Sequence, residues 1–124
     1  MRRYSFMIIS ALLLASPAFA ADPAMMGDTA MGKVFVDGKG MTLYWFDNDM
    51  GGKSACNGPC AANWPPFMAP AGGMASGDWS IIIRDDGSKQ WAYKGHPLYS
   101  WSKDMKTGDI TGDGFNGKWH LAKP

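Results

Sequence analysis

Two cysteines, four positions apart, are the residues of this chain with the clearest chemical potential. Cys56 and Cys60 are its only cysteines. In an oxidising compartment such a pair forms a disulfide by default, and closing so short a loop contributes only about 2 kcal/mol of stability. We therefore expect a local staple, followed by one helical turn near Pro59-Asn63 that ends at Pro65.

The same thiols support a hypothesis of a different class, a periplasmic copper-binding or electron-transfer protein. The spacing is not Cys-x-x-Cys and there is no second cysteine pair, so a metal would need further ligands. Thioether, thiolate and imidazole together favour copper, and eight methionines follow residue 20, with His96 and His120. The alternative is that Met50 and Met105 fill the core. The thiol state separates the two hypotheses, because a closed disulfide offers no thiolates.

A second metal motif begins at Asp109. Residues 109–114 have oxygen-bearing side chains at alternate positions, including Asp113, and a glycine at the sixth, as the start of a calcium loop does. The twelfth position is His120 instead of the bidentate glutamate. The sequence therefore favours a polar turn here and leaves calcium as the alternative.

Two aspartates, Asp49 and Asp104, could form a carboxylate pair of the kind used in acid–base hydrolysis. The more ordinary role for an aspartate just after a strand is to accept backbone N–H bonds in the turn that follows. Neither histidine lies in a motif with a serine, and no glycine loop suited to a phosphate is found. We therefore expect no catalytic residues and rank an enzyme third among the functions considered.

The beginning of the chain predicts export. Arg2 and Arg3 precede an apolar run of about ten residues and then Ala18-Phe19-Ala20, the three parts of a secretory signal peptide. Cleavage is expected after Ala20, so that residues 1–20 are removed. The run is too short to span a bilayer and no later segment is apolar enough, so we expect a periplasmic or secreted protein with no transmembrane segment.

The composition indicates one small all-β domain. Loss of Arg2 and Arg3 with the signal lowers the formal net charge from +1 to −1, which argues against nucleic acid as a partner. All eleven acidic residues are aspartate and glycine is abundant, which favours turns over long helices. We expect a flexible leader over 21–32, a hairpin from 34–37 and 41–46, a linker over 68–77, and a three-stranded meander from 79–84, 89–93 and 96–101.

The two halves of the chain are repeats. A shift of 55 residues superimposes them without a gap, and so many matched large residues are improbable by chance. The matched pairs include Leu43-Tyr44 with Leu98-Tyr99, Phe46 with Trp101, Asp49-Met50 with Asp104-Met105, and Trp64 with Trp119. We expect one domain over 33–122, in which repeat one (33–67) and repeat two (78–122) are related by a pseudo-twofold axis.

Both halves carry the motif Tyr-x-(Phe/Trp/Tyr)-x-x-Asp. Its residues are Tyr44, Phe46 and Asp49 in repeat one and Tyr99, Trp101 and Asp104 in repeat two. Together with the Cys-containing segment 56–66 and the late Trp119-His120, the motif resembles the bacterial secreted-repeat family, also described as predicted lipoproteins. The resemblance covers nearly all of 33–122 and implies an envelope location. It brings no catalytic residues, and the chain lacks the anchoring cysteine of the lipoprotein members.

Aromatic residues offer the remaining candidate site. Because side chains alternate along a strand, burial of Leu43 and Trp45 would turn Tyr44 and Phe46 outward. An exposed aromatic face would suit a sugar, a peptide or a protein, whereas a sandwich would cover both faces. The expected surface comprises Tyr44, Phe46, Trp64, Tyr99, Trp101 and Trp119.

The sequence thus favours an exported, non-enzymatic binding or structural module whose partner is an envelope protein or a polysaccharide. The alternative is the copper or electron-transfer protein that uses Cys56 and Cys60 with methionine or histidine. No cofactor is predicted outright. The metal-ligand candidates, for copper or for calcium, are Cys56, Cys60, His120, Asp109 and Asp113.

Overall fold

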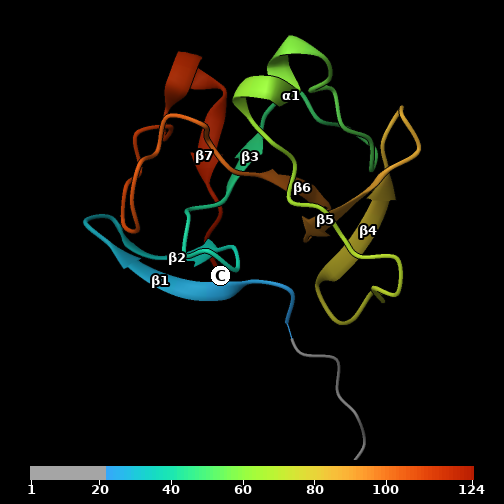
Figure 1. Cartoon of the computed structure of the whole chain (residues 1–124), viewed down its shortest axis with the longest axis horizontal. Helices are drawn as coiled ribbons and strands as arrows, with labels where there is room; N and C mark the ends of the chain where they lie inside the picture. Colours follow the sequence, from blue (N-terminus) through green and yellow to red (C-terminus); the bar gives the residue numbers. More distant parts are fainter. Residues whose placement is uncertain (1–21) are drawn as a thin grey trace, which may run out of the picture.

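The structure, a computed structural model, describes residues 22–124 (Figure 1). It is mostly β, with two sheets and one short helix, which confirms the predicted fold class. The first sheet pairs β1 (Met25–Thr29) with β2 (Gly32–Val36). The second has the order β4 (Trp79–Ile83), β5 (Lys89–Tyr93), β6 (His96–Tyr99), β3 (Tyr44–Phe46) and β7 (Trp119–Leu121). The signal peptide predicted for residues 1–20 lies outside the described residues.

The flexible leader predicted for 21–32 is wrong over most of its length. Met25–Thr29 form β1, which pairs antiparallel with β2 along its full length, Met25 facing Val36 and Thr29 facing Gly32. The segment shows no clear hydrophobic period because most of its side chains are exposed, so its order comes from the backbone ladder. An ordered strand therefore precedes the region in which the sequence predicts the domain to begin.

The helical turn α1 (Pro59–Asn63) lies where the sequence predicts it. Pro59 occupies the first turn, where its missing N–H is not needed. The backbone N–H of Trp64 closes the other end on the carbonyl of Cys60, and Pro65 then prevents continuation. The turn thus fixes the direction in which Trp64 enters the core.

Strand β3 forms the junction between the repeats. It pairs antiparallel with β6, where Tyr44 faces Tyr99, and with β7, where Tyr44 also faces Leu121. The predicted hairpin with the preceding strand is reduced to a bridge between Val36 and Thr42, with two backbone bonds between the segments 35–37 and 41–43. Repeat one therefore places its central strand between two strands of repeat two, as the teal β3 between β6 and the red β7 shows in Figure 1.

The exchange of strands is reciprocal. At the end of repeat two, the N–H of Ala122 donates to the carbonyl of Leu43 in repeat one. At the equivalent point, the N–H of Phe67 donates to the carbonyl of Leu98, and Pro66 bridges Tyr99 as Leu121 does Tyr44. Each repeat thus completes the sheet of the other with its last segment.

Both faces of this junction are buried. On one face lies a cluster that includes Tyr44, Tyr99 and the disulfide-bonded Cys56, and on the other a cluster that includes Leu43 and Leu98. Leu43 and Tyr44 are consecutive and both fully buried. Of the two alternatives that the sequence left open, an exposed aromatic face or a sheet covered on both faces, the structure therefore has the second.

Candidate functional site

The motif tyrosines and aspartates bond across the repeats. The Tyr44 hydroxyl donates to Oδ2 of Asp104 at 2.6 Å, and the Tyr99 hydroxyl donates to Oδ2 of Asp49, also at 2.6 Å. The second oxygen of each aspartate accepts a backbone N–H in its own turn, from Thr111 for Asp104 and from Ala55 for Asp49. Each carboxylate thus ties a loop of one repeat to the core of the other, and these four groups act in folding.

Burial controls the ionisation of these groups. It raises the pKa of both tyrosines far above the ordinary value of 10.0, and the hydrogen bonds to Asp104 and Asp49 raise them further, so both phenols stay neutral. Burial also raises the pKa of Asp49, while bonds from Ala55 and Tyr99 and the charge of Arg84 oppose that rise. Neutral phenols are the donors that the two carboxylates need.

The predicted aromatic binding surface is wrong. Five of its six members are buried and Phe46 is half-buried, because they stack in the core. Trp64 and Trp119 are parallel with ring centroids 3.7 Å apart, Phe46 stacks on Trp119 at 4.1 Å, and Trp101 stacks on Trp64 at 3.9 Å. The repeats thus contribute equivalent rings to one continuous stack, which leaves no aromatic face for a ligand there.

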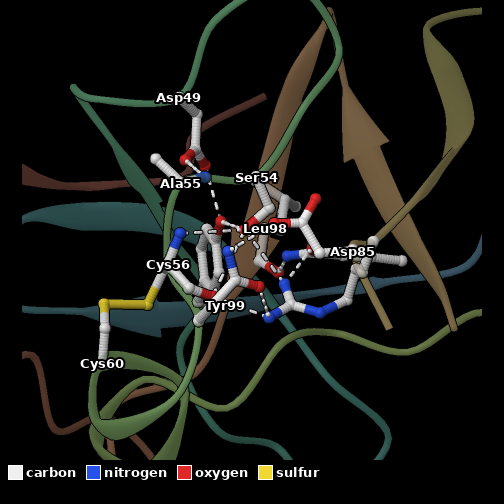
Figure 2. Close-up of a disulfide and its surroundings, with 11 residues drawn as sticks. Asp49, Ser54, Ala55, Cys56, Cys60, Asp85, Leu98 and Tyr99 are labelled. Atoms are coloured by element: carbon white, nitrogen blue, oxygen red, sulfur yellow. Dashed lines mark hydrogen bonds between the residues drawn. A yellow bond between two sulfur atoms is a disulfide. The ribbon is translucent and has the colours of Figure 1, made fainter. Parts of the chain in front are cut away.

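The predicted disulfide is confirmed between Cys56 and Cys60. Figure 2 shows it beside a polar network that includes Ser54 and Tyr99. Arg84 belongs to the same network. The buried guanidinium donates to the carbonyl of Cys56, to Gln90 and to Ser54 Oγ. Ser54 in turn lies 2.6 Å from the Tyr99 hydroxyl. The network anchors the disulfide loop to the strands of repeat two.

The metal candidates do not converge. The closed disulfide removes both thiolates, Asp109 accepts bonds from the backbone of Met105 and from Lys106, and His120 bonds with Asp47. Within residues 22–124, no three histidine, cysteine or carboxylate residues gather as a metal centre would need. The suggestion that Met50 and Met105 fill the core is also wrong, because they are 77% and 82% exposed. They lie in the turns that follow the motif aspartates.

One exposed site gathers side chains capable of recognition. Trp45, half-buried on β3, packs between His96 of β6 and His120 of β7, each with its ring centroid 4.4 Å from the indole. Nε2 of His120 lies 2.8 Å from Asp47 Oδ1, so the imidazole is oriented. Beside the indole is a cleft of about 140 Å³, here named the Trp45 cleft. Its lining residues are Trp45, Tyr93, Lys94, His96, Leu98, Ala122 and Lys123.

The duplication supplies an internal comparison for this cleft. A second cleft of about 420 Å³, here named the Ser100 cleft, contains the repeat equivalents of six of the seven lining residues. The leucine and the lysine of the turn are the same in both. The other positions differ, with Ser100 in place of Trp45, Gly38 in place of Tyr93, Phe67 in place of Ala122 and Met68 in place of Lys123. Met41 and Pro65 stand where repeat two has His96 and His120.

The fold therefore forms this cleft wall without a tryptophan, a tyrosine or a histidine. Those residues in the Trp45 cleft are not required by the strand exchange or by the turn. The sequence suggests His96 only as a copper ligand, Trp45 only for burial and Tyr93 not at all, because the predicted binding surface uses positions at which the repeats agree. The informative signal was the set of positions at which they differ.

Lys94 adds a second sign of specialisation. It stands with Gly95 in the two-residue turn between β5 and β6, and it has a φ of +49°, a left-handed conformation that non-glycine residues rarely adopt. Asparagine or glycine would adopt it with less strain, and for other residues the cost is about 1 kcal/mol. The equivalent Lys39 has no positive φ. The turn places the Lys94 ammonium 5.5 Å from the centre of the Tyr93 ring.

Comparison with known protein families finds one family that matches both halves of the chain. The sequence profile of a family described as "secreted repeat of unknown function" matches residues 25–68 and again residues 80–123. The chain belongs to this secreted-repeat family. The two matches are separated by 55 residues, which confirms both the predicted register and the resemblance. No curated protein and no solved structure matches the chain.

The secreted-repeat match gives the extent of each unit. The first match begins at β1, within the segment predicted from the sequence to be a leader, and it ends at Met68. The second ends at the equivalent Lys123. Each family repeat thus includes the closing segment that pairs with the other repeat. Within residues 22–124, no helix is long and apolar enough to cross a membrane.

Proposed function

We propose that this protein is an exported, non-enzymatic binding module of the bacterial envelope whose binding site is the Trp45 cleft. Its partner is an envelope protein or polysaccharide, and the mature chain begins after Ala20. Export is supported by the signal-peptide pattern and by the family description of the repeats as secreted. The observation that carries the proposal is the difference between the two equivalent clefts.

The buried core supports the proposal, because folding alone explains why the motif residues are present in both repeats. The motif tyrosines, aspartates and large rings bond or stack with one another across the repeats. Trp45 and His96 have no such counterpart, since Ser100 and Met41 stand at their equivalent positions. Of the two equivalent clefts, the Ser100 cleft thus retains only what folding needs, and the extra groups of the Trp45 cleft remain for recognition.

The indole N–H signals of ¹⁵N-labelled protein test this proposal. Five of the six tryptophans are buried, so Trp45 is the reporter of the cleft, and Trp45→Phe assigns its signal. Solubilised envelope polysaccharide or envelope protein fractions should shift the Trp45 signal and leave the other five in place. If none of the fractions moves the Trp45 signal, the cleft is not the binding site.

A further inference from the structure

We infer that the Trp45 cleft recognises a carboxylate carried on a single six-membered ring. This inference rests on the proposed function and names the chemistry of its ligand. Such a group has two sources, a uronic acid residue of an acidic polysaccharide or a free aromatic acid.

The charge of the cleft is positive. Lys94 and Lys123 lie at its rim with the exposed imidazole of His96, and no carboxylate side chain of residues 22–124 is among its lining residues. Asp47, the partner of His120, is not among the lining residues. The equivalent position of Lys123 in the Ser100 cleft is Met68, so this positive charge is present in the Trp45 cleft and absent from the Ser100 cleft. A negatively charged group therefore complements this site.

The size and the walls of the cleft favour a ring. Trp45, Tyr93, Leu98 and Ala122 supply aromatic and aliphatic surface. A volume of about 140 Å³ is small for a ligand pocket and suits one ring with its substituents. A carboxylate directed at the lysines would place its ring against these walls.

The cleft is held rigid before a ligand arrives. Its walls come from the paired strands β3, β5 and β6. Lys123 donates to the carbonyl of Met31, which fixes the side chain while two of its ammonium hydrogens remain available. Lys94 is held in a strained turn beside the Tyr93 ring. Fixed charges of this kind bind an anion with a smaller entropic cost than mobile ones.

Isothermal titration calorimetry with defined probes tests the inference. The probes are trigalacturonate and benzoate, with galactose and benzamide as their uncharged counterparts. We expect at least one acid to bind, its counterpart to bind at least tenfold more weakly, and its affinity to fall with added salt. Binding of trigalacturonate alone assigns the ligand to a polysaccharide, and binding of benzoate alone assigns it to a free aromatic acid.

Matched variants locate the binding. Lys123→Met introduces the residue that the other cleft has at this position, and it should weaken the acid about tenfold. Lys39→Met makes the same change at the lysine of the Ser100 cleft, which is equivalent to Lys94, and should leave the affinity unchanged. Equal binding of acids and uncharged counterparts, or no binding of either acid, overturns the inference. Neither result touches the proposed function, which fails only if every envelope fraction leaves the Trp45 signal unmoved.

Discussion

Trp64 and Trp119, which occupy equivalent positions in the two repeats, stack with their ring planes within 1° of parallel and their centroids 3.7 Å apart. Equivalent residues that touch must lie across the axis that relates the repeats, so this axis passes between the two rings. The stack continues outward to Phe46 on one side and to Trp101 on the other. Neither repeat has a complete core without the other.

Division of the chain in the exposed loop at residues 73 and 74 tests this interdependence. Fragments 22–73 and 74–124 should each be unfolded alone, because each lacks the strand segment and the ring that the other supplies. When mixed they should form a 1:1 complex that regains the near-ultraviolet circular dichroism of packed tryptophans. A fragment that folds alone as a monomer with that signal would contradict the strand exchange.

The cross-repeat hydrogen bonds can be measured one at a time. Tyr44→Phe and Tyr99→Phe each leave a carboxylate without its buried donor, and each should lower the free energy of unfolding by about 2 kcal/mol. Tyr93→Phe, at a half-buried tyrosine outside the motif, should change it by less than about 0.5 kcal/mol. Urea unfolding at neutral pH gives all three values. Equal losses of unfolding free energy in all three variants would show that the motif hydrogen bonds stabilise the protein no more than a tyrosine hydroxyl outside the motif does.

Asp49 should make the stability depend on pH. Because burial raises its pKa above the ordinary 3.8, the folded state binds a proton more readily than the unfolded state does. Its contribution is therefore fully present below pH 3.8 and is lost as the pH rises through the folded-state pKa. Asp49→Asn removes this titration. Between pH 3.8 and the folded-state pKa, the unfolding free energy of the variant should fall less steeply with rising pH than that of the unmodified protein. If the two pH profiles are parallel, Asp49 is not the cause of the pH dependence.

The sequence predicted those features that depend on local pattern or on agreement between the halves. The disulfide, the turn at Pro59–Asn63 and the register of 55 residues are of this kind. It could not predict that Tyr44 bonds with Asp104, because within one repeat Asp49 is the nearer partner in the chain and strand exchange leaves no local trace. The binding surface was wrong for the same reason, since stacking across the axis buries rings that a single repeat would expose.

The disulfide should stabilise the protein only modestly. It closes a very short loop, for which constraint of the unfolded chain contributes about 2 kcal/mol. The double variant Cys56→Ala, Cys60→Ala should therefore remain folded and lose about that amount in urea unfolding. The carbonyl of Cys56 would still accept from Arg84, so the loop keeps its anchor. Complete unfolding of the variant would show that the disulfide does more than constrain a local loop.

The most direct test of the account measures stability and binding together in Lys94→Asn. Asparagine suits the left-handed first position of this turn, so the variant should unfold with a free energy about 1 kcal/mol higher. It should also bind the acidic probe about tenfold more weakly, because a cationic partner is lost. Lys39→Asn, at the equivalent position without a positive φ, should change neither quantity in this way. A gain in stability with a loss of affinity is the result predicted for a residue retained for binding, and unchanged affinity would contradict the assignment of the Trp45 cleft.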